Sequence, residues 1–356
     1  MNKFEKNFLF KYLNNYSPVG HESSGQKIWL LYLKSYVDDF FTDVYGNAVG
    51  VINPNSDYKV VIEAHSDEIS WMISYITKEG YMYVIKNGGS DYDIAPSMRV
   101  NIHTKKGMVS GVFGWPAIHT RDQQKKINPS ISTVILDCGC NSNKEVEKLG
   151  IHIGCIVTFK DESFEMNKDF LVGRALDNKI GGFIIAQVAT KIKINKINLP
   201  YSLYIVNSVQ EEVGLKGAAI ISNRIKPNLA IITDATHDTQ SPLYNKIKEG
   251  DIKCGMGPVL SFAPSVQNNV LKMLTEVAKN NNIPFQRLAA SPRTGTDADA
   301  FAYSNSGVAS GLISLPLKYM HTTVEMVHKN DIKNIIEVIY QFLINLKVNH
   351  NFSYFK

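Results

Sequence analysis

Acidic and imidazole side chains recur directly after apolar segments of this 356-residue chain. The first pair, His65 and Asp67, follows the apolar run KVVIEA, which is typical of a buried β-strand. An imidazole can ligate a metal ion, and a carboxylate two residues along an extended chain can hydrogen-bond its other ring nitrogen. The same spacing also fits a buried histidine with satisfied hydrogen bonds, so this pair indicates a metal site only together with further ligands.

Three more carboxylates occupy comparable positions. Asp177 lies in GRALDNKIGG at the start of a predicted helix, where it could cap the helix or bridge two cations. Glu211 and Glu212 follow the apolar strand YSLYIVNS. Adjacent side chains point in different directions, so one glutamate could bind a metal while the other acts as a general base. An ordinary surface turn is the alternative for this pair.

Asp234 and His321 complete the set of candidate ligands. Asp234 follows the predicted strand LAIIT, where it could be a terminal metal ligand or merely start a turn. His321 follows the strand GLISLPL, and a capping or buried histidine is the alternative there. Both therefore lie where a strand of the predicted sheet ends, and in open α/β sheets ligands bind at the carboxyl ends of the strands.

Taken together, two histidines, two aspartates and one glutamate form a balanced ligand set for two divalent cations. Zn²⁺, Co²⁺ and Mn²⁺ accept such mixed nitrogen and oxygen ligands. Two cations about 3.5–4 Å apart can hold a bridging hydroxide and polarise a carbonyl group. This chemistry suits the hydrolysis of an amide bond.

Alternating helices and strands must position these residues. We predict helices at 3–16, 20–36, 178–192, 215–224, 266–281 and 331–347, a hairpin of 38–45 and 47–52 around Gly46, and strands at 59–64, 201–208, 229–233 and 309–315. Between about residues 69 and 164, short strand-like segments alternate with Gly, Pro and Asn turns. The pattern predicts an α/β domain of residues 1–68 and 166–356 with a β-rich domain inserted at 69–165.

Composition argues against several other classes of protein. The net charge is +5, and the largest basic cluster, Arg121–Lys126, is interrupted by one acid and two amides, which favours a solvated surface over nucleic-acid binding. Four cysteines without a paired framework indicate free thiols in a reducing compartment, although Cys138 and Cys140 could form a thiolate pair. Neither a signal peptide nor an apolar run long enough for a membrane span is present, so a cytoplasmic location is expected.

The order of the motifs resembles that of the tetrahedral (TET) aminopeptidases, metallopeptidases that include glutamyl and deblocking aminopeptidases. The resemblance covers nearly the whole chain and rests on segments such as SPVGHE, AHSDEI, GRALDNKIGG, QEEVGLKGA, TDATHDT, GTDADAFA and HTTVEMV. It implies a mixed-sheet α/β enzyme that uses two cations per subunit, Zn²⁺ or Co²⁺, to hydrolyse the N-terminal peptide bond of short peptides. It further implies that residues 69–165 form a small PDZ-like β-barrel used in dimer assembly, and that dimers build a tetrahedral dodecamer.

The resemblance also implies a role for each residue. His65 and Asp234 resemble the terminal ligands of one metal, Glu212 and His321 those of the other, and Asp177 the bridging ligand, whose peptide bond to Asn178 could be cis. Glu211 resembles the general base, and Asp67 the carboxylate that orients His65. Asp297, in GTDADA, matches a motif near the substrate and is expected to fix the substrate or the metal shell; a helix cap formed by Thr296 and Asp297 is the alternative.

A few residues depart from the family pattern, namely Ser66, Ser70, Asn178 and Lys179, but none of them replaces a proposed ligand or base. A carboxypeptidase, dipeptidase or amide deacylase could use a similar two-metal site. A non-catalytic scaffold should have lost a ligand, and none is lost. A glycoside hydrolase needs only two carboxylates across a sugar ring, which would leave both histidines unexplained.

Overall fold

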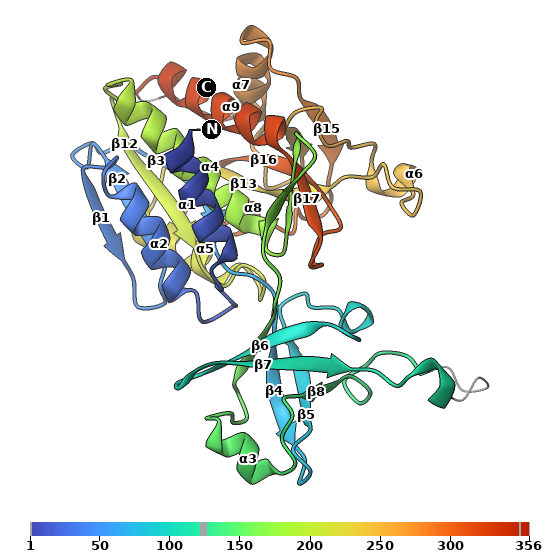
Figure 1. Ribbon diagram of the computed structural model, residues 1–356. Helices are drawn as coiled ribbons and strands as arrows, with labels where there is room; N and C mark the ends of the chain where they lie inside the picture. Colours follow the sequence, from blue (N-terminus) through green and yellow to red (C-terminus); the bar gives the residue numbers. More distant parts are fainter. Residues whose placement is uncertain (1, 122–126, 349, 356) are drawn as a thin grey trace.

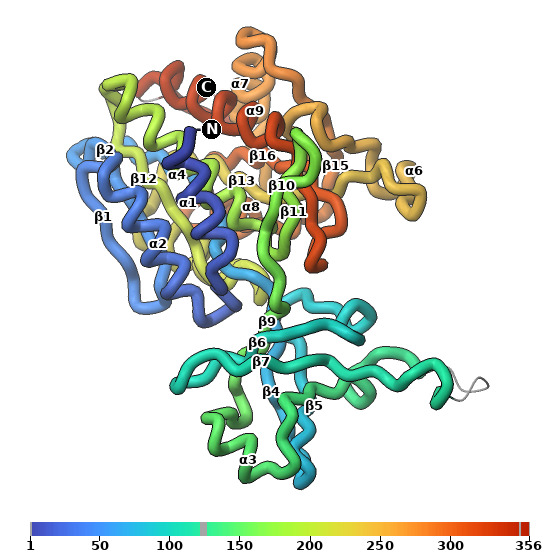
Figure 2. The backbone as a smooth tube through the Cα atoms, viewed as in Figure 1, coloured from blue at the N-terminus to red at the C-terminus, as the bar shows by residue number. Residues whose placement is uncertain are grey.

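The computed structural model describes residues 2–121, 127–348 and 350–355, and it consists of a large α/β part and a smaller β-barrel (Figure 1). The barrel lies at one end of the α/β part, and the chain enters the barrel from the α/β part and later returns to it (Figure 2). Of the basic cluster Arg121–Lys126, all but Arg121 falls outside the described residues. In the described ranges no helix is both long and apolar enough to cross a membrane.

A mixed sheet forms the centre of the α/β part. Its strands lie in the order β1 (Asp39–Thr42), β2 (Ala48–Ile52), β12 (Ser202–Ser208), β3 (Lys59–His65), β13 (Leu229–His237), β16 (Ala309–Lys318), β17 (Glu325–His328), β11 (Phe170–Gly173) and β10 (Phe164–Met166), with β14 (Val259–Phe262) on β16 and β15 (Gln286–Ala289) on β14. The four middle strands β12, β3, β13 and β16 are parallel. Their apolar runs are buried because helices cover them, as parallel sheets require.

Helix α4 (Leu176–Ile194) is the central helix. It packs on β3, β12 and β13, and α1 (Lys3–Asn14), α2 (Ser23–Leu33) and α9 (Lys329–Asn345) pack against it. Nearly every residue of α4 is buried, as expected for a helix that is covered on all sides. The other helices of the α/β part are α5 (Lys216–Ile225), α6 (Lys246–Glu249), α7 (Asn268–Asn280) and α8 (Asp297–Ala302), of which α5 and α8 contact each other.

The barrel has its own hydrophobic core. Six strands of the described chain close in the order β4 (Ser70–Ile76), β5 (Met82–Asn87), β8 (Ile135–Asp137), β7 (Gly107–Gly114), β6 (Arg99–Thr104) and β9 (Ile156–Phe159), and α3 (Asn143–Lys148) follows β8. The buried Trp71 ring contacts Phe113 and Phe159 edge-on inside it. The fold class is therefore the mixed α/β architecture with an inserted β-barrel that the sequence predicts. Because β10 already pairs with β11 of the large sheet, the boundary at residue 165 stays a prediction.

Candidate active site

The candidate ligands meet at the carboxyl ends of the parallel strands. His65 ends β3, Asp234 lies in β13, and Glu211 and Glu212 follow β12. The parallel register sets His65 opposite Ser208 of β12, so the residues that follow the two strands emerge side by side. The structure also brings in His321 from the loop between β16 and β17. Side chains separated by more than 250 residues therefore share one site, as expected for this edge of an α/β sheet.

Two triads of ligand atoms share Asp177. In the first, Nε2 of His65 lies 3.4 Å from Oδ1 of Asp177 and 3.5 Å from Oδ1 of Asp234. In the second, Nε2 of His321 lies 3.6 Å from Oδ2 of Asp177 and 3.1 Å from Oε1 of Glu212. Each triad has its ligand atoms within 4.8 Å of one another, close enough to hold one metal ion. Each of the two oxygens of Asp177 thus faces a different histidine.

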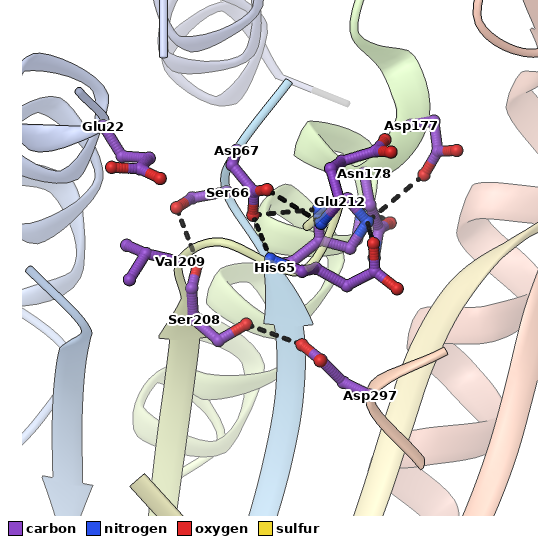
Figure 3. Close-up of polar contacts among 12 residues, drawn as sticks. Glu22, His65, Ser66, Asp67, Asp177, Asn178, Ser208, Val209, Glu212 and Asp297 are labelled. Carbon is purple, nitrogen blue, oxygen red and sulfur yellow. Dashed lines mark hydrogen bonds and ion pairs between the residues drawn. The ribbon is translucent and has the colours of Figure 1, made fainter. Parts of the chain in front are cut away.

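Asp67 lies behind this cluster and is completely buried. Its Oδ1 and Oδ2 accept hydrogen bonds from the backbone N–H groups of Glu211 and Glu212, at 3.0 and 3.1 Å. Its Oδ1 also lies 3.4 Å from Nδ1 of His65, the ring nitrogen that faces away from Asp177 (Figure 3). Asp67 therefore connects the β3 ligand to the loop after β12 and leaves Nε2 of His65 free for a cation.

The backbone around Asp177 is not helical, although it forms the start of α4. Its peptide bond to Asn178 is cis, and both residues have φ and ψ values outside the helical region. The Asn178 side chain donates to the Thr233 carbonyl at 2.8 Å and accepts from the N–H of Gly181 at 3.1 Å. Asn178 thus caps the helix, and the carboxylate of Asp177 is free to face the two histidines.

Three of the residues with a left-handed backbone lie at the ligands, while others are spread over the described chain. Ala175, Gln210 and His321 have φ values of 56°, 58° and 62°. This conformation costs an L-residue about 1–2 kcal/mol, so surrounding contacts must stabilise it. Each of the three residues lies within two positions of a candidate ligand or is one. At these three positions the surrounding contacts therefore also hold the backbone of the site.

Charges in the cluster shift the proton affinities of its members. Burial opposes protonation of His321, but Asp177 and Glu212 outweigh it and raise its pKa to about 11. For His65 the balance is similar, and Asp177, Asp234 and Asp67 hold its pKa well above the usual value against the effect of burial. Burial raises the pKa of Glu211 to about 10. The site therefore attracts positive charge strongly.

The donor set fits divalent cations. In the described chain, Oδ1 of Asp177 is buried without a hydrogen-bond partner, and a buried polar atom of this kind is costly unless something binds it. Imidazole nitrogen and carboxylate oxygen are the ligands that Zn²⁺ and Co²⁺ accept. Each histidine nitrogen lies beside the carboxylate oxygens of two acids, and a cation bound between them would have all three as ligands.

Three contacts that the sequence did not single out support the site. Glu325, the first residue of β17, accepts hydrogen bonds from the backbone N–H groups of Asp177 and His321. Gly89 comes from the barrel, and a Cβ atom added to it would lie 2.6 Å from the His321 ring. Glu68 binds Arg174 and the buried Lys179, which holds the segment before α4 against the end of β3. The Gly-Gly pair after β5 is the sequence feature that could have indicated the close approach of the barrel to His321.

Asp297 lies apart from the two triads. It is 1% exposed, and its Oδ2 accepts from the Ser208 hydroxyl at 2.8 Å (Figure 3). That same hydroxyl lies 2.6 Å from Oε1 of the buried Glu63. One hydroxyl proton cannot serve both carboxyls, so burial and Asp297 hold the pKa of Glu63 well above its usual value. Thr296 is the residue that caps α8, and its side chain accepts from Ala298.

Known proteins are similar to this chain in sequence and in fold. A family model of the M42 glutamyl aminopeptidases matches residues 46–338. The chain is 32% identical over 318 residues to a lysyl aminopeptidase of Pyrococcus furiosus, an alignment that covers 88% of this chain and 89% of that protein. The fold is similar to a TET aminopeptidase from a Thaumarchaeota archaeon, SCGC AB-539-E09, with a TM-score of 0.91 and 25% identity over 97% of each chain. It is also similar to the TET1 peptidase of Pyrococcus horikoshii, which can assemble into a tetrahedron or a large octahedral shell; the TM-score is 0.84, with 27% identity over 96% of this chain and 100% of that one.

The fold and the paired triads define a metallopeptidase. The chain belongs to the M42 glutamyl aminopeptidase family. It is accordingly a hydrolase and a metal-dependent aminopeptidase. The resemblance to the TET aminopeptidases, the enzyme class and the fold class that the sequence predicts are thus confirmed.

Proposed function

We propose that this aminopeptidase removes the N-terminal residue of short peptides with two divalent cations, Zn²⁺ or Co²⁺. His65 and Asp234 would hold one cation, Glu212 and His321 the other, and Asp177 both. The observation that carries this proposal is the position of Asp177, whose two oxygens face the two histidines at 3.4 and 3.6 Å. A carboxylate placed in this way can bridge two cations, whereas a helix cap would point along α4.

Glu211 is the general base in this proposal. Two bound cations would supply Lewis-acid chemistry for the scissile carbonyl and would lower the pKa of water enough for a base to take its proton. Glu211 takes the proton of the attacking water and returns it to the leaving amine. Its carboxylate belongs to neither triad that contains Asp177, and its Oε2 lies 3.9 Å from Nε2 of His65. Glu211 is therefore next to the ligands without being needed as one of them.

Asp67 positions both glutamates. Its two oxygens hold consecutive backbone N–H groups, which aims the side chains of Glu211 and Glu212 in different directions from one fixed loop. One glutamate can therefore serve as a ligand while its neighbour acts as the base. Asp297 stays proposed as a residue that fixes the substrate or the metal shell, acting from behind Ser208.

Replacing Glu211 with Gln tests the base directly. The variant keeps the size of the side chain but cannot accept the proton, so we expect kcat to fall about 10²–10⁴-fold while two metals still bind. Turnover is measured on a panel of aminoacyl-anilides, with chelator treatment and re-addition of Zn²⁺ or Co²⁺. Wild-type turnover in a Glu211→Gln variant that holds both metals would remove Glu211 from this role.

A second panel, of short peptides, tests the reaction itself. Each peptide is offered with a free and with an acetylated N-terminus, and release from free amines only is expected. Preference for the acetylated peptide would show a deacylase instead, and cleavage only from the carboxyl end would show a carboxypeptidase. The residue released fastest names the preferred N-terminal side chain.

We further propose a homo-oligomer, built from dimers into a tetrahedral dodecamer, with residues 69–165 as the dimerisation domain. The similarity to a peptidase that can assemble into a tetrahedron supports this proposal. The barrel also exposes apolar side chains, among them Met108, Ile118 and Ile153, that a neighbouring subunit could cover. Four free thiols support a cytoplasmic location. Light scattering of the purified protein measures the mass of the particle, and a monomer would contradict the assembly.

A further inference from the structure

We propose that Glu325 is the positioning residue that sets the bridging Asp177 and the ligand His321 at a fixed separation. This inference rests on the proposed two-metal site. Glu325 is 2% exposed and begins β17, directly after the loop that carries His321. It pairs across the sheet with Gly173, which ends β11 and leads into the segment that carries Asp177. Glu325 therefore lies between the two chain segments that must meet at the second metal.

The two oxygens of Glu325 have different partners. Oε2 accepts from the backbone N–H of Asp177 at 3.1 Å, and Oε1 accepts from the backbone N–H of His321 at 2.7 Å. A single carboxylate thus spans the backbones of two ligands that are 144 positions apart in the chain. Hydrogen bonds to a charged acceptor are among the stronger ones in proteins.

These two N–H groups need such an acceptor. Asp177 lies in the non-helical start of α4, and His321 has a left-handed backbone with a φ of 62°, so neither takes part in a regular helix or strand ladder. A buried N–H group without a partner is costly, and a residue with positive φ is held only by its surroundings. Glu325 satisfies both groups at once and so stabilises the strained backbone of a metal ligand.

The geometry assigns Glu325 a positioning role rather than a place among the ligands. Both of its oxygens already accept a backbone N–H, and it belongs to none of the ligand triads found in the described chain. The 3.6 Å separation between Asp177 and His321 depends on the loops that Glu325 joins. Its loss should therefore loosen the triad of Asp177, Glu212 and His321 more than the triad that contains His65 and Asp234.

The chain offers a matched control in Asp331. This buried acid also accepts two backbone N–H groups, those of Gly255 and Gly257 at 2.6 and 2.8 Å, but contacts none of the ligands. Asp331→Ala therefore removes the same kind of interaction from a different part of the fold. Its effect measures what the loss of a buried carboxylate does to stability alone.

The experiment is a Zn²⁺ titration of wild type, Glu325→Ala, Glu325→Gln and Asp331→Ala in competition with a chromophoric chelator, with urea unfolding of each protein. We expect Glu325→Ala to weaken one of two Zn²⁺ sites about 10–100-fold, the usual effect of removing a residue that orients a ligand. Glu325→Gln, which keeps one acceptor oxygen and the shape of the side chain, should lose less, and Asp331→Ala should keep wild-type affinity at both sites.

Two other results have separate meanings. Wild-type protein that binds neither Zn²⁺ nor, in the same titration, Co²⁺ would overturn the proposed function itself. Wild type with two sites, and Glu325 variants that bind both ions as tightly as Asp331→Ala does, would overturn only the positioning role. If Glu325→Ala does not fold, Glu325→Gln decides the question by the same comparison.

Discussion

Removing the Asp67 side chain should weaken both the fold and the metal site. The carboxylate is completely buried and accepts two backbone hydrogen bonds, from Glu211 and Glu212. A hydrogen bond to a charged group contributes about 1.5–3 kcal/mol, so Asp67→Ala should cost about 3–6 kcal/mol in the metal-loaded protein. In the metal-free protein the loss should be smaller, because one negative charge leaves a cluster of carboxylates that repel one another.

Metal binding should suffer as well. Asp67 faces Nδ1 of His65, and removing such a partner typically lowers metal affinity 10–100-fold. Asp67→Asn should have an intermediate effect, since the amide can accept only one of the two N–H groups and turns an NH₂ group toward the other. We therefore expect the unfolding midpoint to fall in the order wild type, Asn, Ala.

The assay is urea unfolding with saturating Zn²⁺ and with chelator, followed by tryptophan fluorescence, and a parallel Zn²⁺ competition titration. Trp29 lies in the core of the α/β part and Trp71 in that of the barrel, while Trp115 follows β7, so the signal reports the unfolding of both parts. An Asp67→Ala protein with wild-type midpoints and wild-type Zn²⁺ affinity would refute the reasoning.

Two further predictions concern the barrel and the pH. Gly89→Ala should displace the His321 ring and weaken one metal site, because the new Cβ would lie 2.6 Å from it; Gly114→Ala, where the nearest atom is 3.9 Å away, should leave both Zn²⁺ affinities unchanged. Burial raises the pKa of Glu22 to about 7, and the acids raise that of His321 to about 11 against burial, so the folded metal-free chain binds more protons than the unfolded chain. Its thermal midpoint should therefore fall from pH 5 to pH 9, while stabilisation by added Zn²⁺ grows; a rising midpoint in scanning fluorimetry would contradict this.

Most regular elements of the α/β part were predictable because their hydrophobic periods are clear. The run KVVIEA predicts the buried strand β3, and the predicted terminal helix 331–347 corresponds to α9 at Lys329–Asn345. The short strands β10, β11, β14, β15 and β17 were not predicted. Segments of three or four residues carry too little periodicity to be recognised, and their strand form depends on pairing with neighbours distant in sequence.

The candidate ligands could be proposed from sequence because metal chemistry demands particular residue types at strand ends. His65 and Asp234 end up 3.5 Å apart since β3 and β13 are parallel neighbours. The pattern could not distinguish a capping Asp177 from a bridging one, because that depends on backbone angles at one peptide. In the structure Asn178, and not Asp177, accepts the N–H of Gly181 at the start of α4.

The sequence by itself determined the family, the α/β class and the residue types of the candidate metal site, because these depend on local patterns and on ligand chemistry. Only the tertiary structure decided what holds those residues in place. Glu325 accepts backbone N–H groups of Asp177 and His321, Gly89 lies against the His321 ring, and Asp297 accepts from the Ser208 hydroxyl. Apart from the hydrogen bond between His321 and Glu325, these contacts join segments far apart in the chain that meet only when the sheet and the barrel have formed.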